Sequence, residues 1–353
     1  MIKAEHHRLQ GLVKAIFTAA GSEEAEAECV SQHLVQANLS GHDSHGVIRT
    51  TKYMQWLREQ RVVVNQHAQV VWESDVLAIV EGNMGYGQVI GAEAVRLGVD
   101  KCDNQGVALV ALRGAAHLGR IGHWAEMAAE AGLISLHFVS TNGFGVLVAP
   151  HGGIERRLSA NPMAAGIPGQ DAEPIILDIS TCAIAEGKIL VAKNKGVTVP
   201  QGCILDAEGQ PTEDPQRFYA DPPGTILPMG QHKGYGLSLM VELLAGALTG
   251  NGCSQQRGSR LEQGMLSIYL DPARVERGGG FHAEASEFVR WVKSSRTATP
   301  DGQILLPGEV ESRNRARRMA DGIELDDTTW QQLVAEAQQL GVSSDWITSV
   351  ANN

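Results

Sequence analysis

The sequence predicts an α/β domain of residues 61–309 and a helical domain that residues 1–60 and 310–353 build together. Three observations predict this fold class. Apolar residues recur at helical spacing at both ends of the chain. The middle of the chain alternates short apolar runs with helical patterns, which is typical of α/β proteins. The run from Val107 to Leu112 is continuously apolar, as in a strand covered on both faces.

The chain begins with two predicted helices. Residues 7–20 carry apolar side chains along one side, and Gly21 is expected to end this first helix. Ser22 is expected to cap the second helix, whose first turn is acidic, and Gly41 is expected to end it. We therefore expect the residues that follow Gly41 to lie at the edge of this helical unit.

The rest of the chain supplies the α/β elements and a helical tail. Strands are expected where short apolar or β-branched runs occur, and helices where the apolar period is about 3.6 residues. The expected strands are 61–64, 69–72, 76–80, 107–112, 133–139, 174–179 and 265–270. The expected helices are 89–104, 123–131, 234–248, 283–293, 310–321 and 326–340.

Composition excludes several classes of protein. The chain has 353 residues and a net charge of −11, which argues against nucleic acid as a partner. Its five cysteines form no C-x-x-C pair, which indicates a reducing compartment and argues against a zinc ribbon. The first residues contain no apolar signal core, and no apolar run is long enough to span a bilayer. We therefore expect a cytoplasmic protein without membrane contact.

The stretch Gly41–Tyr53 gathers groups that handle protons and bind anions. His45, Arg49 and Tyr53 recur every four residues, so a helix from about Ser44 would place them on one face. The Arg49 guanidinium could hold a carboxylate through two parallel hydrogen bonds. The His45 imidazole, with a pKa near neutrality, could move a proton on the neighbouring oxygen, and Ser44 could orient either group. This pattern suits a small anionic substrate with a hydroxyl or carbonyl beside its carboxylate.

Two alternatives accompany this interpretation. A solvated helix face often carries His, Arg and Tyr without any function. His42 and His45 are three residues apart, which suits two metal ligands on a helix. Nearby cysteine or carboxylate partners are few, so we expect no metal.

The standard dinucleotide fingerprint is missing. The stretch Gly85–Gly91 follows a predicted strand and precedes a helix, but it has one residue too many between its second and third glycines. We expect a turn there. Pattern alone therefore names no nicotinamide cofactor.

Six fragments, in order along the chain, carry a family resemblance. They are Gly41–Gly46, Ala116–Gly122, Ser159–Pro162, Leu177–Lys188, Gln231–Gly236 and Ile304–Glu309. Together they resemble the malate/L-lactate dehydrogenase family of the second type, which is unrelated to the Rossmann-type lactate and malate dehydrogenases. The resemblance implies a non-Rossmann α/β domain that binds NAD(H) or NADP(H), and a homodimer.

The resemblance also implies roles for residues of these fragments. His45 and Ser44 would be catalytic, and Arg49, His117, Tyr53 and Asn161 would bind substrate. The cofactor would be held by Gly119, Arg120, Ile121, Asp178, Ile179, Ser180, Thr181, Cys182, His232, Lys233, Leu306, Pro307, Gly308 and Glu309. As structure alone, the Ala116–Gly122 loop could be a mere glycine-rich turn, and Asp178 could be a helix cap.

Some positions depart from the family pattern. Ser159 and Ala160 stand where the family usually has Gly-Thr, so this loop departs from the family pattern at two positions. Lys188 stands where some cyclic imine reductases of the family carry an acid, which favours a hydroxy-acid dehydrogenase.

The function expected from the resemblance is hydride transfer between nicotinamide and C2 of a small 2-hydroxy or 2-oxo acid. This would make the chain an NAD(P)-dependent 2-hydroxycarboxylate dehydrogenase. One alternative is an NAD(P)H-dependent reductase of cyclic imino acids. The other is a non-catalytic ligand-binding protein on the same scaffold.

Overall fold

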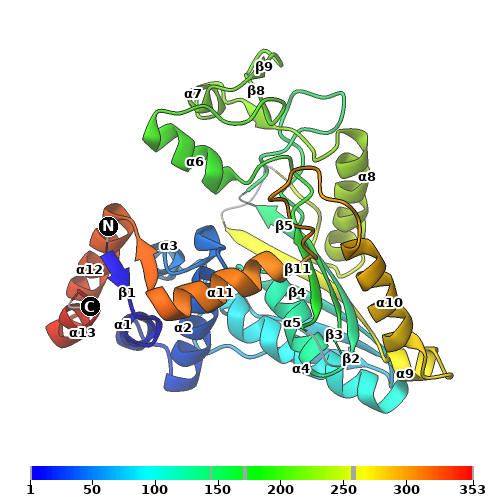
Figure 1. Ribbon diagram of the computed structural model, residues 1–353. Helices are drawn as coiled ribbons and strands as arrows, with labels where there is room; N and C mark the ends of the chain where they lie inside the picture. The colour runs from blue at the N-terminus through cyan, green and yellow to red at the C-terminus, as the bar shows by residue number, and fades with distance from the viewer. Residues whose placement is uncertain (1, 144, 170–172, 256–259, 352–353) are drawn as a thin grey trace.

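A seven-stranded sheet forms the centre of the molecule. The computed structural model describes residues 2–143, 145–169, 173–255 and 260–351, and Figure 1 shows the sheet between a helical bundle and a small lobe. Among the described strands, β3 and β4 pair in parallel, and all other neighbours in this sheet pair antiparallel. The order is β2 (Gln69–Glu73), β3 (Leu77–Glu81), β4 (Val107–Ala115), β11 (Leu261–Leu270), β5 (Ile134–Gly143), β6 (Met163–Ile167) and β7 (Ile175–Ile179).

Helices cover both faces of this sheet. On one face, α4 (Gly87–Gln105) and α5 (Gly122–Glu130) pack on β4, β5, β6 and β11. On the other face, α8 (His232–Val241) continues into a π-helix, η2 (Glu242–Ala247), which packs on β5 and β11. The central strands of the sheet are therefore covered on both sides, which explains why β4 is almost continuously apolar, whereas the edge strand β2 is exposed.

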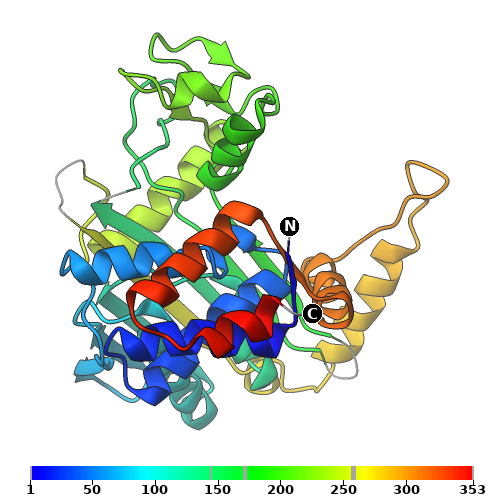
Figure 2. The same ribbon diagram turned by 90° about the vertical axis from the view of Figure 1, so that its left-hand side faces the viewer.

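The two ends of the chain pack against each other. Strand β1 (Ile2–Ala4) pairs antiparallel with β12 (Ile323–Leu325), and Figure 2 shows the N- and C-terminal segments side by side. One hydrophobic core joins residues from both ends, including Leu9, Leu34 and Leu333. The helices involved are α1 (His6–Ala19), α2 (Glu24–Leu39), α3 (Arg49–Arg58), α11 (Glu309–Asp321), α12 (Asp327–Gln339) and α13 (Ser344–Ala351). The division of the chain at residues 60 and 310 itself stays a prediction.

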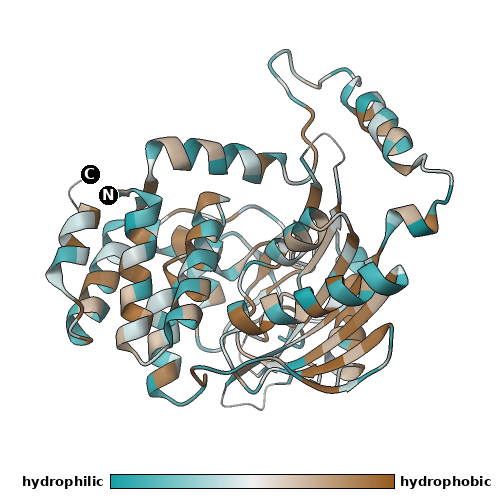
Figure 3. Cartoon of the chain, turned by 90° about the horizontal axis from the view of Figure 1, so that it is seen from below, coloured by the Kyte–Doolittle hydropathy of each residue, from teal (hydrophilic) through white to brown (hydrophobic). Residues whose placement is uncertain are grey.

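A small lobe and an arm extend from the sheet. The lobe contains α6 (Glu186–Lys195), α7 (Pro215–Phe218) and a sheet of β8 (Ile204–Leu205), β9 (Pro211–Thr212) and β10 (Thr225–Ile226), around its own core. The arm carries α9 (Pro272–Val275) and α10 (Phe281–Lys293), and α10 stands away from the body in Figure 3. Residues 61–309 thus contain the sheet, the lobe and the arm.

The structure corrects two local expectations. Residues 61–64 form no strand, because the backbone turns at Gln60 and Asn65, both at positive φ, and Val62 packs into the core of the helical bundle. Ser22 does not cap α2: the cap position is Glu23, and the Ser22 hydroxyl instead donates to the Glu26 carboxylate over 2.7 Å.

No helix among the described residues is long and apolar enough to cross a membrane.

Close contact between α4 and the sheet depends on a glycine. A Cβ at Gly98 would lie 2.2 Å from the buried ring of Tyr269 on β11. We expect Gly98→Ala to lower the free energy of unfolding by about 1–3 kcal/mol, because the core must shift to admit the methyl group. Chemical denaturation at fixed pH measures the change.

The matched control is Gly236→Ala, also within a helix, where a Cβ would meet nothing within 4 Å. That variant should be neutral or slightly more stable, because alanine favours helix over glycine. Equal stability of the two variants would show that the α4–β11 contact is not tightly packed.

Candidate active site

The Gly41–Tyr53 stretch folds as two pieces, so the expected single helix from Ser44 is wrong. A 3₁₀ turn, η1 (Asp43–His45), is followed by extended backbone at Gly46, and α3 begins at Arg49. The break has a cause in α2: the Asn38 side chain accepts the Val47 N–H over 2.8 Å and donates to Asp43 over 2.7 Å. A Cβ at Gly46 would collide with this amide at 2.2 Å.

Arg49 is anchored in a way that leaves its terminal amino groups available. Its Nε donates to the Ser44 carbonyl over 2.6 Å. No side chain in the described part of the chain forms an ion pair with Arg49. The guanidinium is therefore held beside His45 with its two amino groups free to bind a carboxylate side by side.

The structure brings His45 and His117 together. Their rings stack with centroids 5.5 Å apart and planes 17° from parallel. The Ser44 hydroxyl lies 3.1 Å from Nδ1 of His45, which supports an orienting role for this serine. The Nε2 atoms of both histidines have no hydrogen bond to any described residue and are not sealed from solvent.

The pKa of His45 differs from the near-neutral value expected from sequence. Burial, and then the positive charge of Arg49, lower the pKa of His45 to about 3. The imidazole is therefore neutral at physiological pH. A neutral imidazole can accept a proton from a substrate hydroxyl.

Tyr53 lies behind His117 rather than on a substrate-facing surface. Its ring is 2% exposed, and its hydroxyl lies 2.7 Å from Nδ1 of His117. The Gln88 side chain donates to the same hydroxyl over 2.9 Å. Tyr53 thus supports the imidazole of His117 from behind. Direct contact between Tyr53 and substrate stays a prediction, and the burial of Tyr53 disfavours it.

Arg120 is committed to a buried ionic network. It is 3% exposed, forms a salt bridge with Glu126 at 3.0 Å and lies 3.4 Å from Asp178. Its guanidinium also donates to the Ser40 hydroxyl over 3.2 Å. Arg315 of α11 bonds the same Glu126 and Ser40. This network ties the His117 loop to the end of α2, just before the η1 turn.

Asp178 caps the N-terminus of α5, a helix that is remote from it in sequence. Its carboxylate accepts the backbone N–H of Gly122 over 3.0 Å, at the first residue of α5. The capping alternative therefore describes what Asp178 does here, although the helix is not the one that follows it. The expected cofactor contacts of Arg120 and Asp178 stay predictions.

Contacts join four of the six fragments of the family resemblance directly, and they join the other two through Met229 and Ile176, which lie just outside the fragments. The His45 ring stacks on His117, and the Asp178 carboxylate accepts the Gly122 N–H. A Cβ added at Gly187 of α6 would lie 3.3 Å from the Cβ of Ser44. Backbone hydrogen bonds add Thr181 N–H to Ala160, Met229 N–H to Thr181, and Ile176 N–H to Pro307. Fragments more than 200 residues apart thus form one continuous region.

Asn161 is enclosed in this region. It is 0% exposed, with a positive φ of 40°, and its amide donates to Ser238 over 2.9 Å and to Glu242 over 2.7 Å. Its carbonyl accepts the Ser159 hydroxyl. Both polar atoms of its side chain are used inside the protein, so the predicted substrate contact of this side chain has no support in this arrangement.

The remaining expected cofactor residues line three loops. Ile121 and Cys182 are buried, Ile179 and Ser180 are half-buried, and Ser180 lies 3.2 Å from the Cys182 sulfur. Leu306, Pro307, Gly308 and Glu309 form the turn into α11, where Gly308 has a φ of 94°. Gly119, at a φ of 72°, lies against His33, which leaves no room for a Cβ.

The donor set at the start of α8 fits an anionic cofactor. His232 and Lys233 are exposed on its first turn, and neither is paired with an acid in the described part of the chain. A Cβ at Gly236 would meet nothing within 4 Å. The N–H groups of Lys233 and Gly234 already donate to backbone carbonyls, so the two basic side chains, the positive end of the helix dipole and the open space are what would suit an anionic group such as a pyrophosphate.

Several residues of the site region could not be found from sequence. Gln88, Glu126 and His33 reach the His117 loop from α4, α5 and α2, and the His33 ring accepts the Arg120 N–H over 3.1 Å. The local sequence feature that could have drawn attention to Gln88 is the glycine-rich turn beside it, at Gly85. The other two lie in ordinary helical patterns.

The two histidines proposed as alternative metal ligands, His42 and His45, have different partners in the structure. His42 bonds the Glu311 carboxylate over 3.1 Å, whereas His45 faces His117. Among the described residues, one group has donor atoms close enough to hold a metal, and it is Glu5, His6 and His7 at the start of α1.

With the site described, comparison with known proteins defines its class. Residues 4–334 match the model of the malate/L-lactate dehydrogenase family. The chain is 39% identical to hydroxycarboxylate dehydrogenase B of Escherichia coli (strain K12), with 96% of this chain and 94% of the relative covered. It is 35% identical to L-sulfolactate dehydrogenase of Methanothermobacter thermautotrophicus, with 94% and 95% covered.

A comparison with solved structures points to the same family. The structure of a putative malate/lactate dehydrogenase from E. coli matches with a TM-score of 0.94 and 38% identity, covering 99% of this chain and 98% of that one. The chain belongs to the malate/L-lactate dehydrogenase family.

The buried histidines predict how stability depends on pH. Burial lowers the pKa of His33, His45, His117 and His137, so the folded protein keeps all four neutral. The unfolded chain binds protons once the pH falls below about 6.5. Stability should therefore fall from pH 6.5 to pH 5, by up to about 1.4 kcal/mol per histidine per pH unit. Exposed His67, whose pKa is raised by Glu93, opposes this weakly.

Denaturant unfolding between pH 7.5 and 5 measures this dependence. His137→Gln, in the interior of the sheet, should remove one histidine's share of the slope. A profile that is flat over this range would contradict neutral burial of these side chains.

Proposed function

We propose that the chain is an NAD(P)-dependent dehydrogenase of a small 2-hydroxy acid. The observation that carries this proposal is the placement of Arg49 beside the stacked His45 and His117, with unused hydrogen-bonding atoms on all three. A carboxylate on Arg49 would bring the oxygen on the adjacent carbon to the two imidazoles. Relatives named hydroxycarboxylate and sulfolactate dehydrogenases support the same substrate class.

The chain's own groups bind and polarise the substrate. Arg49 holds the carboxylate, and His45, oriented by Ser44, exchanges the proton on the substrate oxygen. In oxidation, the neutral His45 accepts the hydroxyl proton. A carboxylate on Arg49 offsets the positive charge that lowers the pKa of His45, so substrate binding assists this step. In reduction the transfer runs backwards: His45 first takes up a proton from solvent and then gives it to the substrate oxygen, while donors aimed at that oxygen stabilise the charge that develops there.

The nicotinamide cofactor, when bound, supplies or takes up the hydride at C2 of the substrate. His232 and Lys233 at the start of α8 are the residues that would hold its pyrophosphate. The loops at Gly119, Ser180 and Gly308 would line the rest.

We further propose a homodimer, as the family resemblance implies. The arm supports this proposal, because it exposes apolar side chains that a monomer would leave in water: Val275 is 69% exposed, Phe288 59% and Trp291 70%. We also propose that the protein works in the cytoplasm without nucleic acid or membrane partners, which its negative net charge supports.

The test is a turnover assay with purified protein, NADH and NADPH, and a panel of 2-oxo acids and cyclic imino acids. The proposal expects oxidation of one reduced cofactor with 2-oxo acids. Turnover of cyclic imines alone would assign the chain to imino acid reduction. Cofactor binding without turnover on either panel would indicate a ligand-binding protein.

Arg49→Lys should mainly weaken substrate binding. Lysine keeps the charge but loses both the fork and the Nε bond to Ser44, a loss of about 1–3 kcal/mol. That corresponds to a rise in KM for the 2-oxo acid of roughly 5- to 150-fold, since 1.4 kcal/mol is tenfold. Steady-state kinetics measure it.

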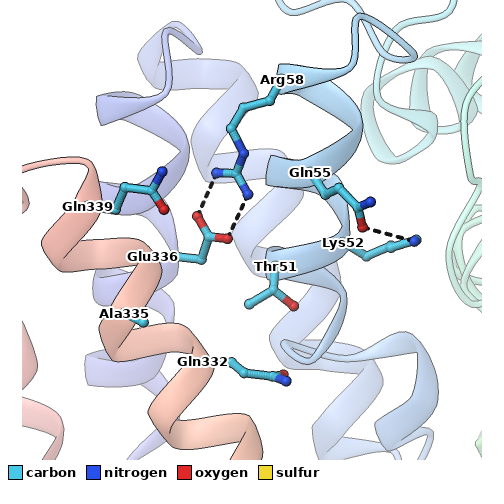
Figure 4. A pocket seen from close by; sticks show the side chains of 8 residues that line it. All are labelled: Thr51, Lys52, Gln55, Arg58, Gln332, Ala335, Glu336 and Gln339. Carbon is cyan, nitrogen blue, oxygen red and sulfur yellow. Dashed lines mark hydrogen bonds and ion pairs between the residues drawn. The ribbon is translucent and has the colours of Figure 1, made fainter.

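The matched control is Arg58→Lys on the same helix. Arg58 forms a two-armed pair with Glu336 in a groove between α3 and α12, shown in Figure 4. Its KM should stay at the wild-type value. An equal KM effect in both variants would remove Arg49 from the carboxylate site.

His45→Asn should lower kcat and leave nicotinamide binding nearly intact. Asparagine remains polar but cannot exchange a proton near neutral pH, and loss of a positioned acid or base costs ~10²–10⁴-fold in rate. Cooperative melting and quenching by NAD(P)H show first that the variant is folded. His117→Asn is the control, because two imidazoles adjoin the site. A hundredfold loss in His117→Asn, with His45→Asn near wild type, would transfer the proton-exchange role to His117.

A further inference from the structure

Three buried side chains form a chain of hydrogen bonds behind the site. Gln88, at the start of α4, donates from its amide nitrogen to the Tyr53 hydroxyl over 2.9 Å. That hydroxyl lies 2.7 Å from Nδ1 of His117. The three residues are 1%, 2% and 8% exposed, so water does not compete for these bonds.

The backbone carbonyl of His117 determines which way the Gln88 amide points. The amide nitrogen of Gln88 also lies 3.4 Å from this carbonyl oxygen, which can only accept a hydrogen bond. The opposite orientation would place the Gln88 carbonyl oxygen against the His117 carbonyl oxygen, two acceptors with no proton between them. The nitrogen of Gln88 therefore faces Tyr53, and it can only donate.

The direction of the remaining bond follows. The Tyr53 oxygen accepts from Gln88, and its single proton has one acceptor within reach among the described residues, Nδ1 of His117. If Nδ1 carried a proton, the Tyr53 O–H would be buried with no acceptor, which is unfavourable.

We propose that Gln88 is a positioning residue that acts through Tyr53 to hold His117 in the tautomer with its proton on Nε2. This inference rests on the proposed function, in which His117 faces the substrate oxygen. Nε2 is the ring atom that no described residue bonds.

The tautomer divides the work between the two histidines. His117 presents an N–H that donates to the substrate oxygen and stabilises the negative charge developing there during reduction. With its Nε2 lone pair unavailable, His117 is not the base during oxidation. His45, whose partner is the Ser44 hydroxyl, is left to exchange the proton.

Electrostatics favour neutral groups along this chain. Burial, and then the charge of Arg49, hold the pKa of His117 well below its usual range. Burial raises the pKa of Tyr53 to about 12. Neither a phenolate nor an imidazolium therefore disturbs the order of donors and acceptors near neutral pH.

The test reads the tautomer directly, by two-dimensional NMR of protein labelled with ¹⁵N-histidine, in which protonated and bare ring nitrogens have well-separated shifts. The His117 signals are identified by their loss in His117→Asn. The wild-type protein, without substrate, should show His117 protonated at Nε2. Protonation at Nδ1, or an even mixture, would overturn the proposal without any variant.

Two substitutions change the chain in different ways. Gln88→Glu replaces the donor by a carboxylate that accepts the Tyr53 proton above its own pKa, so the Tyr53 oxygen must accept from Nδ1 and the tautomer should invert. Gln88→Met removes the donor and should give a mixture. Gln88→Glu should lower kcat by about tenfold to a hundredfold, and Gln88→Met only in proportion to the fraction of His117 that leaves the Nε2–H tautomer; KM for the cofactor should stay unchanged in both.

Gln263→Glu is the matched control. Gln263 is also buried beneath the His117 loop and accepts the Leu118 N–H over 2.7 Å, but it has no contact with Tyr53. It adds the same charge and should keep the wild-type tautomer. Inversion in this control, or no change in Gln88→Glu and Gln88→Met, would overturn the proposal. Loss of dehydrogenase activity with the Nε2–H tautomer present would contradict the proposed function alone.

Discussion

The candidate active site depends on one contact, the stacking of His45 on His117 at 5.5 Å. These residues lie on different units, one at the edge of the helical bundle and one on the loop after β4. The buried network of Arg120, Glu126 and Arg315 holds these units together around Ser40. Removing one partner of a buried ion pair typically costs about 3–5 kcal/mol, because a charge remains without compensation. Residues that contact neither imidazole therefore help to set how the two rings meet.

The order of elements could be predicted from periodicity, but their pairing could not. Apolar runs located β4, β5, β7 and β11, whereas β6 escaped notice because Ala164, Ala165 and Gly166 give it no alternating pattern. Gly166 is required there, since a Cβ would lie 2.6 Å from a carbonyl of α5. The insertion of β11 between β4 and β5 joins segments more than 100 residues apart, and no local pattern records such a pairing.

The site could be predicted only in part, because local sequence patterns do not record contacts between separate elements. Residue types at short spacing identified His45, Arg49 and Ser44, and the resemblance added His117. The inward turn of Tyr53 and the enclosure of Asn161 follow from tertiary partners, Gln88 and Glu242, that spacing does not reveal. The expected helix through Gly46 failed because a side chain of α2 offers the Val47 N–H an alternative acceptor. Long-range side-chain contacts thus decided each departure.

The central claim is that a 2-oxo acid binds with its carboxylate on Arg49 and its oxygen between His45 and His117. A crystal structure with nicotinamide cofactor and oxamate, an unreactive isostere of a 2-oxo acid, tests it most directly. The account predicts both terminal amino groups of Arg49 on the oxamate carboxylate, and the amide oxygen within hydrogen-bond distance of both Nε2 atoms. Oxamate bound elsewhere, for example in the groove of Figure 4, with His45 and His117 untouched, would contradict it.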